Sequence, residues 1–107
     1  MTSSLNLNQI QKKVEDWIQT HGGYWPPLSM LASITEEVGE LAREINHLEG
    51  YKPKKPQKGK GLIGEELADI LFSIVCVANH YQIDLDEKFK NVLEKYKKRD
   101  SERFNKK

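Results

Sequence analysis

The hydrophobic residues recur mostly every three or four positions, the spacing that gathers side chains on one face of an α-helix. This pattern predicts four helices, over about residues 7–20, 29–48, 63–81 and 84–103, and no strand. The second helix has the most regular apolar stripe, formed by Leu31, Ile34, Val38, Leu41, Ile45 and Leu48. We therefore expect an all-α, four-helix, bundle-like subunit.

Turn-forming residues separate the predicted helices. The segment HGG (21–23) ends the first helix, and YWPP (24–27) follows as a rigid, non-helical connector. Residues 51–61, YKPKKPQKGKG, are rich in lysine, proline and glycine and have almost nothing to bury, which predicts an exposed loop. Asp84 and Glu87 have the spacing of a capping box at the start of the fourth helix.

Composition narrows the class of protein. The 107 residues are 37% hydrophobic and 31% charged, which indicates one soluble globular domain over 1–107, with 104–107 as a frayed tail. The sequence has no apolar run of the ~20 residues that cross a bilayer and no secretory signal. A net charge of +1 argues against a nucleic-acid partner. Cys76, the lone cysteine, fits a reducing compartment, so we expect a cytoplasmic protein.

Two acidic blocks, EEVGE and EELAD, lie in the second and third predicted helices. Because a helix turns by about 100° per residue, Glu37 and Glu40 flank the apolar stripe of the second helix. Glu66 and Asp69 border the core-facing side of the third helix in the same way. If the two helices pack together, these four carboxylates converge.

Four converging carboxylates are unfavourable unless their pKa values rise or a cation lies among them. Their donor atoms are all oxygen, which indicates Mg²⁺, with Mn²⁺ as a substitute. Mg²⁺ typically binds substrate phosphates together with a few carboxylates. The expected chemistry is therefore metal-assisted attack of water on a phosphoanhydride.

Two alternatives explain the acidic blocks differently. In a non-catalytic helical interaction module they would only solvate the bundle, and Mg²⁺ would affect neither thermal stability nor pyrophosphate release. In a di-iron or di-manganese carboxylate bundle they would hold redox metals. The second alternative is weakened because neither acidic block contains the Glu-x-x-His motif of such bundles.

The segments TEEVGELAREI (35–45) and GEELADILFSIVCVANHYQIDL (64–85) resemble the MazG-like nucleotide pyrophosphohydrolases, part of the all-α NTP pyrophosphatase group. The family signature is E-x-x-E, a spacer, and E-x-x-D. In this chain it falls on Glu37, Glu40, Glu66 and Asp69. The resemblance extends over about residues 25–99.

This resemblance implies an activity, a cofactor and an assembly. The family splits a nucleoside triphosphate between its α and β phosphates with Mg²⁺, giving a monophosphate and pyrophosphate, and clears non-standard or surplus (d)NTPs. Its helical subunits work as dimers or tetramers. The implied metal ligands are Glu37, Glu40, Glu66 and Asp69. Glu36, or another carboxylate that holds no metal, would orient or deprotonate the attacking water.

Five further residues are candidates for substrate binding. The segment KYKKR resembles the family's Lys-aromatic-x-x-Arg, so Lys95 and Arg99 would reach substrate phosphates. Trp25 would stack on the base, and His47 and Ser73, on the acidic sides of their helices, would line a base or sugar pocket. Alternatively, Lys95 and Arg99 lie on a solvated helical face and Trp25 covers the core. His47 and Ser73 would then be ordinary polar residues at the flank of their helices.

The third predicted helix is apolar around nearly its whole circumference over residues 70–78. Phe72 and Cys76 point away from its main stripe. A four-helix chain of this size does not easily surround one helix, so we expect a homo-oligomer with an oligomeric helical core.

Overall fold

The structure, a computed structural model, describes residues 4–50 and 60–104. Within these ranges it contains four α-helices and no strand: α1 (Leu7–Gln19), α2 (Pro27–Leu48), α3 (Lys60–His80) and α4 (Leu85–Phe104). The all-α, four-helix prediction is therefore confirmed.

The helix bounds differ from the predicted ones by a few residues. α2 begins at Pro27 and α3 at Lys60, both earlier than predicted. Most of the predicted loop over 51–61 lies outside the described residues. α4 includes Phe104, the first residue of the predicted tail, and 105–107 lie outside the described residues.

Hydrogen-bonded caps explain where α1 and α4 start, and a proline explains the start of α2. Asn6 Oδ1 accepts from the Gln9 amide at 2.8 Å, and Gln9 Oε1 accepts from the Asn6 amide at 2.8 Å, a reciprocal cap on α1. Pro27 is the first residue of α2, where its missing N–H costs no helical hydrogen bond. Asp84 Oδ1 accepts from the Glu87 amide at 3.2 Å, which confirms the predicted cap of α4.

A tight turn after α1 sets the path into α2. Gly22 and Gly23 have φ values of +102° and +86°, a region that other residues rarely adopt. The Gly23 amide donates to the Ile18 carbonyl at 2.9 Å and closes the end of α1. The chain then passes through Tyr24 and Trp25 to the start of α2.

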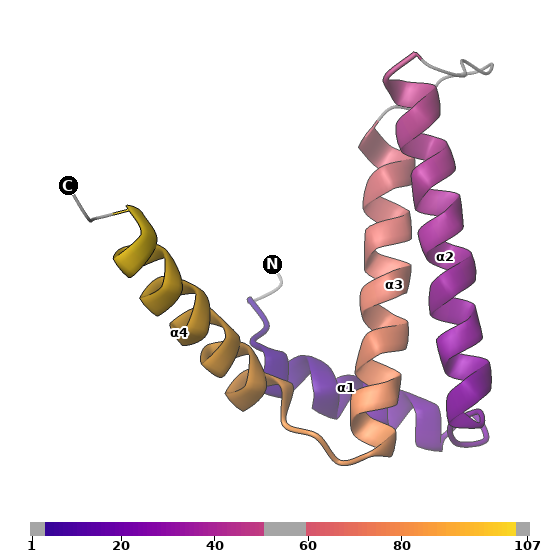
Figure 1. The fold of residues 1–107 in the computed structure, drawn as a ribbon. Helices are drawn as coiled ribbons and strands as arrows, with labels where there is room; N and C mark the ends of the chain where they lie inside the picture. The colour runs from indigo at the N-terminus through magenta and orange to yellow at the C-terminus, as the bar shows by residue number, and fades with distance from the viewer. Residues whose placement is uncertain (1–3, 51–59, 105–107) are drawn as a thin grey trace.

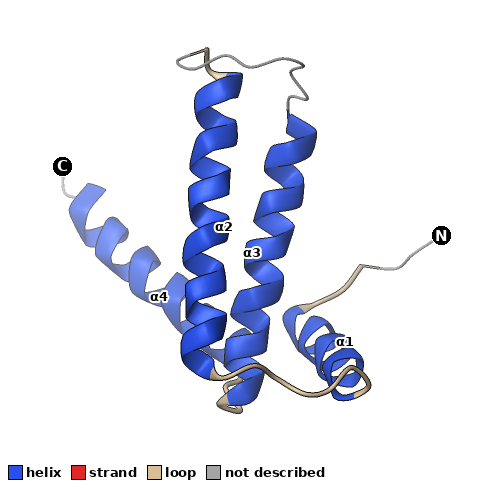
Figure 2. Ribbon diagram, turned by 90° about the vertical axis from the view of Figure 1, so that its right-hand side faces the viewer, coloured by secondary structure: helices blue, strands red, loops and turns tan. Residues whose placement is uncertain are grey.

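α2 and α3 form an antiparallel hairpin and lie side by side along most of their length (Figures 1 and 2). α1 crosses the base of this hairpin and packs against α3. α4 contacts α1 and projects away from the α2–α3 hairpin (Figure 1). The acidic blocks therefore sit on the two helices that pack most closely.

The core lies at the base of the hairpin, where α1, the start of α2 and the second half of α3 meet. Its buried residues are Val14, Met30, Val75 and Cys76. Cys76 is only 6% exposed, so the expectation that it faces outward from the core of its own chain is wrong. The reason is that α1 covers this side of α3. Phe72 remains 40% exposed, as predicted for the outward side.

Many apolar side chains stay at the surface of the single chain. Leu31, Val38 and Ile45 follow one another at seven-residue intervals along α2 and are 43–54% exposed. α4 exposes a second set, formed by Phe89, Val92, Leu93 and Tyr96. Among the described residues, no helix combines the length and apolar character that crossing a membrane requires.

Candidate metal centre

The antiparallel pairing of α2 and α3 brings the two acidic blocks together. Glu37 of α2 and Glu66 and Asp69 of α3 each offer one carboxylate oxygen, and these oxygens lie within 4.8 Å of one another. We call these three residues the acidic cluster. Glu37 and Glu66 are half-buried, and Asp69 is exposed. Three of the four predicted ligands thus meet in one place.

Glu40, the fourth predicted ligand, lies one turn beyond Glu37 and borders the cluster. It is half-buried, and its Oε1 is 3.5 Å from Arg43 Nη2 in an exposed ion pair. The negative charge of Glu40 contributes to the raised pKa of Glu66. Such an exposed pair is weak, so it does not hold Glu40 firmly in this position.

The neighbouring carboxylates act on the pKa of Glu66. A hydrogen bond with Glu37, followed by desolvation and by the charges of Glu37, Asp69 and Glu40, raises the pKa of Glu66 to about 7. Glu66 therefore retains a proton up to near-neutral pH. A bound cation would supply the positive charge that this proton now supplies.

A hard divalent cation fits this donor set. Glu66 Oε2 is buried and has no hydrogen-bond partner among the described residues, which leaves one acceptor oxygen unsatisfied. All donors are oxygen, the type that Mg²⁺ prefers. Adjacent oxygens around Mg²⁺ lie about 3 Å apart and opposite ones about 4.2 Å, so oxygens that already lie within 4.8 Å of one another are near the range that one ion requires.

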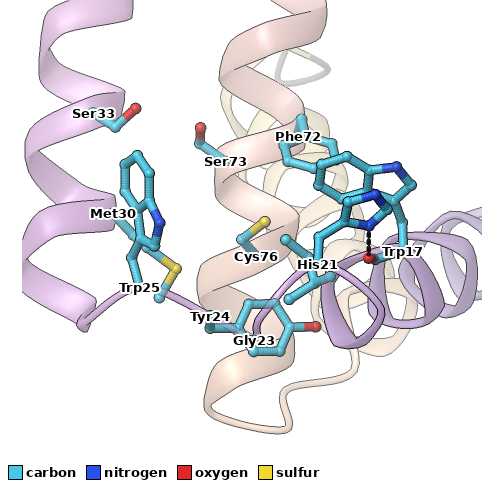
Figure 3. A pocket seen from close by; sticks show the side chains of 11 residues that line it. Trp17, His21, Gly23, Tyr24, Trp25, Met30, Ser33, Phe72, Ser73 and Cys76 are labelled. Atoms are coloured by element: carbon cyan, nitrogen blue, oxygen red, sulfur yellow. Dashed lines mark hydrogen bonds between the residues drawn. The ribbon is translucent and has the colours of Figure 1, made fainter.

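An open cavity of about 410 Å³ lies at the base of the hairpin (Figure 3), and two of its lining residues, Ser33 and Ser73, are one helical turn from the acidic cluster. Trp25 and Met30 line one side of it, and Trp17, His21 and Phe72 line the other. The Trp17 and His21 rings stack with centroids 4.0 Å apart. We call this cavity the aromatic pocket. Its flat rings and open mouth suit a planar aromatic ligand.

Two hydroxyl groups lie at the end of the aromatic pocket nearest the acidic cluster. Ser33 precedes Glu37 by one helical turn, and Ser73 follows Asp69 by one turn on the antiparallel helix. Both hydroxyls point into the space between α2 and α3 (Figure 3). Cys76 lies one turn deeper and forms part of the floor.

Two of the predicted substrate-binding residues line the aromatic pocket. These are Trp25, whose side chain is 66% exposed, and Ser73. His47 does not line it, since it lies toward the other end of α2, where its Nδ1 is buried without a partner among the described residues. Glu36, the predicted catalytic residue, is exposed and lies outside the acidic cluster.

Lys95 and Arg99 lie far from the acidic cluster in the single chain. Both are on α4, which projects away from the hairpin (Figure 1). Lys95 Nζ is 5.3 Å and the Arg99 guanidinium carbon 4.7 Å from the centre of the Tyr96 ring. Arg99 also pairs with Asp100 at 3.0 Å. Neither cation contributes to the cluster of its own chain.

Most residues that line the aromatic pocket were not candidates in the sequence interpretation, among them Ser33, Trp17 and His21. Ser33 had a detectable signal, because it lies four positions before Glu37 on the same helical face. Trp17 and His21 gave no comparable signal. They reach the pocket because α1 crosses α3, and that crossing depends on tertiary packing.

Comparison with known proteins supplies independent information. The MazG nucleotide pyrophosphohydrolase domain family matches residues 26–104. The uncharacterized protein YpjD of Bacillus subtilis (strain 168) is 43% identical over 106 residues, which covers 98% of this chain and 96% of YpjD. The match therefore includes both acidic blocks and α4.

Two crystal structures are similar to this fold. That of YpjD from Bacillus subtilis has a TM-score of 0.80 at 43% identity, covering 89% of this chain and 98% of that one. That of the Bacillus-conserved MazG protein, a nucleotide pyrophosphohydrolase, has a TM-score of 0.72 at 38% identity, covering 89% and 93%.

Proposed function

The chain belongs to the MazG nucleotide pyrophosphohydrolase family, and we propose that it uses Mg²⁺ to hydrolyse (d)NTPs between the α and β phosphates. The family match and the similar crystal structure identify the chain as a hydrolase of nucleotide phosphoanhydride bonds. The observation that carries the finer proposal is the acidic cluster one helical turn from a pocket for a planar ring. The products would be a nucleoside monophosphate and pyrophosphate.

The residues that would hold Mg²⁺ are Glu37, Glu66 and Asp69, with Glu40 at the border. When bound, the metal would neutralise charge on the phosphates and make a coordinated water more acidic. Glu66 would give up its proton, and its unsatisfied Oε2 would gain a partner. Mn²⁺ would replace Mg²⁺ because it accepts the same oxygen donors.

Hydrolysis requires the transfer of one proton from water. The water oxygen forms a bond to the α-phosphorus, the bond from that phosphorus to the α–β bridging oxygen breaks, and pyrophosphate leaves. We propose that Glu36, or another carboxylate that holds no metal, accepts the proton of this water. The exposure of Glu36 leaves its carboxylate accessible to solvent, but it does not meet the acidic cluster in this structure.

The aromatic pocket would bind the nucleoside. Trp25 is free to stack on a base, and Ser73 offers a hydroxyl near the phosphates. Stacking recognises the faces of the base and discriminates little among hydrogen-bonding edges. We further propose that the protein clears non-standard or surplus (d)NTPs in the cytoplasm. His47 would contribute only from outside this pocket.

A homo-oligomer, a dimer or tetramer, is part of the proposal. The exposed stripe of Leu31, Val38 and Ile45 has the spacing of a helix–helix seam, and a second copy would cover it. α4 projects away from its own hairpin, so Lys95 and Arg99 would reach phosphates bound by another subunit.

The direct test is a screen of ordinary and modified (d)NTPs with Mg²⁺, in which monophosphate, pyrophosphate and orthophosphate are quantified separately. We expect pyrophosphate and monophosphate in equal amounts, and no turnover when a chelator replaces Mg²⁺. Orthophosphate as the primary product would contradict cleavage between the α and β phosphates. Full activity with the chelator would contradict the metal role.

A further inference from the structure

The two serines of the aromatic pocket lie at a defined level between its aromatic walls and the acidic cluster. Ser33 and Glu37 are four residues apart on α2, which corresponds to about 6 Å along the helix axis. Ser73 and Asp69 have the same separation on α3. Because the helices are antiparallel, both serines are displaced from the cluster in the same direction, toward Trp25.

The hydroxyls of Ser33 and Ser73 are free to bind a ligand. Within the described part of the chain, neither makes a side-chain hydrogen bond, and both point into the space between α2 and α3 (Figure 3). Thr35 differs, since its hydroxyl donates to the Leu31 carbonyl at 3.1 Å, the usual arrangement for a helical hydroxyl. Both serines are half-buried, so a ligand between the helices would contact them.

The phosphates, sugar and base of a nucleotide follow one another in the same order as the acidic cluster, the two serines and the aromatic walls. Only O5′ and C5′ separate the α-phosphorus from the sugar ring, and the base lies on the far side of that ring. With the phosphates at the acidic cluster and the base between the aromatic walls, the sugar falls at the level of the serines. The groups that a sugar presents there are its 2′- and 3′-hydroxyls, which can each donate and accept one or more hydrogen bonds.

We propose that Ser33 and Ser73 together bind the sugar hydroxyls of the nucleotide and make this pocket selective for the sugar. The proposal rests on the proposed function, because the acidic cluster fixes where the phosphates lie. The pocket walls are mainly aromatic and apolar, so these two hydroxyls are the polar groups best placed to read the nucleoside. Selectivity for the sugar would thus exceed selectivity for the base.

The test uses four adenine nucleotides that differ only in the sugar: ribo, 2′-deoxy, 3′-deoxy and 2′,3′-dideoxy. Binding of the monophosphates is followed through the fluorescence of Trp17 and Trp25, which line the pocket, and needs no catalysis. We expect the dideoxy form to bind about fivefold more weakly than the best of the others, the factor for one ordinary hydrogen bond. Hydrolysis of the triphosphates should show the same order.

Ser33→Ala with Ser73→Ala should remove this difference, leaving all four sugars bound equally within about twofold. Alanine is a good helix former, and circular dichroism checks that the helices persist. The matched control is Thr35→Ala, which removes a hydroxyl already bonded within α2 and should keep the wild-type order.

Three outcomes would overturn the inference. They are equal binding of all four sugars by the wild type, an unchanged order in the double serine variant, and no fluorescence response to any of these nucleotides. The proposed function fails separately, if sugar-dependent binding is present but no triphosphate of the substrate screen is hydrolysed.

Discussion

Glu37 and Glu66, on adjacent antiparallel helices, each place a carboxylate oxygen within 4.8 Å of the other and of Asp69. The interaction with Glu37, desolvation and the surrounding negative charges raise the pKa of Glu66 to about 7. The two helices thus bring together groups that repel one another once both are ionised. The acidic cluster is therefore favoured by protons at low pH and would be favoured by a cation at high pH.

The pH dependence of the metal-free protein should reveal the proton of Glu66. Because the folded-state pKa of Glu66 lies above its ordinary value of 4.5, the folded protein binds more protons than the unfolded chain between these two values. The stabilisation from Glu66 is complete below about pH 4.5 and is lost as pH rises through about 7. Chelator-treated protein should therefore lose stability, from this residue, between mildly acidic and mildly alkaline pH.

Glu66→Gln gives the control for that measurement, since glutamine cannot titrate. Urea unfolding of wild type and variant over the same pH range isolates the contribution of this one residue. The wild type should lose stability relative to Glu66→Gln as pH rises through neutrality. Parallel stability curves for the two proteins would contradict the raised pKa of Glu66.

Divalent metal should raise the thermal stability of the folded chain. A ligand that binds only the folded state stabilises it by about 2.7 kcal/mol at a concentration of 100 times its Kd. We expect Mg²⁺ to raise the Tm more above neutral pH than below pH 6, because protons compete for Glu66. Differential scanning fluorimetry with and without Mg²⁺ measures this.

Variants of the cluster test whether the shift comes from this site. Asp69→Asn and Glu37→Gln should lose the Mg²⁺-dependent rise in Tm. Glu49→Gln removes an exposed carboxylate at the end of α2, outside the cluster, and should keep it. An equal shift in all three variants would assign metal binding to another place.

Turnover should depend on Glu40 and Asp69 without a loss of fold. Losing a metal ligand removes several kcal/mol of transition-state stabilisation, so Glu40→Gln and Asp69→Asn should each lower kcat/KM by more than about a hundredfold. Circular dichroism should show unchanged helix content. Near-normal activity in both variants would reject their ligand roles.

Glu36→Gln separates water activation from metal binding. If Glu36 accepts the proton of the water, kcat should fall while the Mg²⁺-dependent rise in Tm stays, because Glu36 lies outside the acidic cluster. Unchanged kcat would mean that another group takes this proton.

Periodicity along the chain was sufficient to predict the four helices and the pairing of the acidic blocks. Helical spacing is a local property, and Glu37, Glu66 and Asp69 meet because they lie on the sides of α2 and α3 that face each other. The bounds were less predictable, as Pro27 shows: proline is tolerated at the first helical position, but it was assigned to the connector.

Features that depend on tertiary packing could not be predicted from the spacing of hydrophobic residues. Cys76 was expected to face another subunit, but α1 crosses α3 and buries it with Val14. The same crossing carries Trp17 and His21 to the aromatic pocket. The direction of α4 likewise depends on contacts with α1, so the distance from Arg99 to the cluster could not be inferred from helix spacing.

The direction of α4 leads to a prediction about subunits. In one chain Arg99 is on a helix that projects away from the acidic cluster, and it pairs with Asp100. If α4 of one subunit completes the site of another, two inactive variants should restore each other. We expect Asp69→Asn and Arg99→Ala to be weakly active alone, and a mixture that has exchanged subunits to gain activity, because mixed oligomers contain sites with both residues intact.

Light scattering measures the oligomeric state on which the mixing experiment depends. The wild type should be larger than one chain at micromolar concentration, and Val38→Asp, which places a charge in the exposed stripe of α2, should shift it toward monomer and lower activity. Ala32→Asp adds the same charge on an exposed side of α2 that is turned away from that stripe, and it serves as control. A monomeric, fully active wild type, or a mixture no more active than its components, would show that Arg99 does not act across a subunit interface.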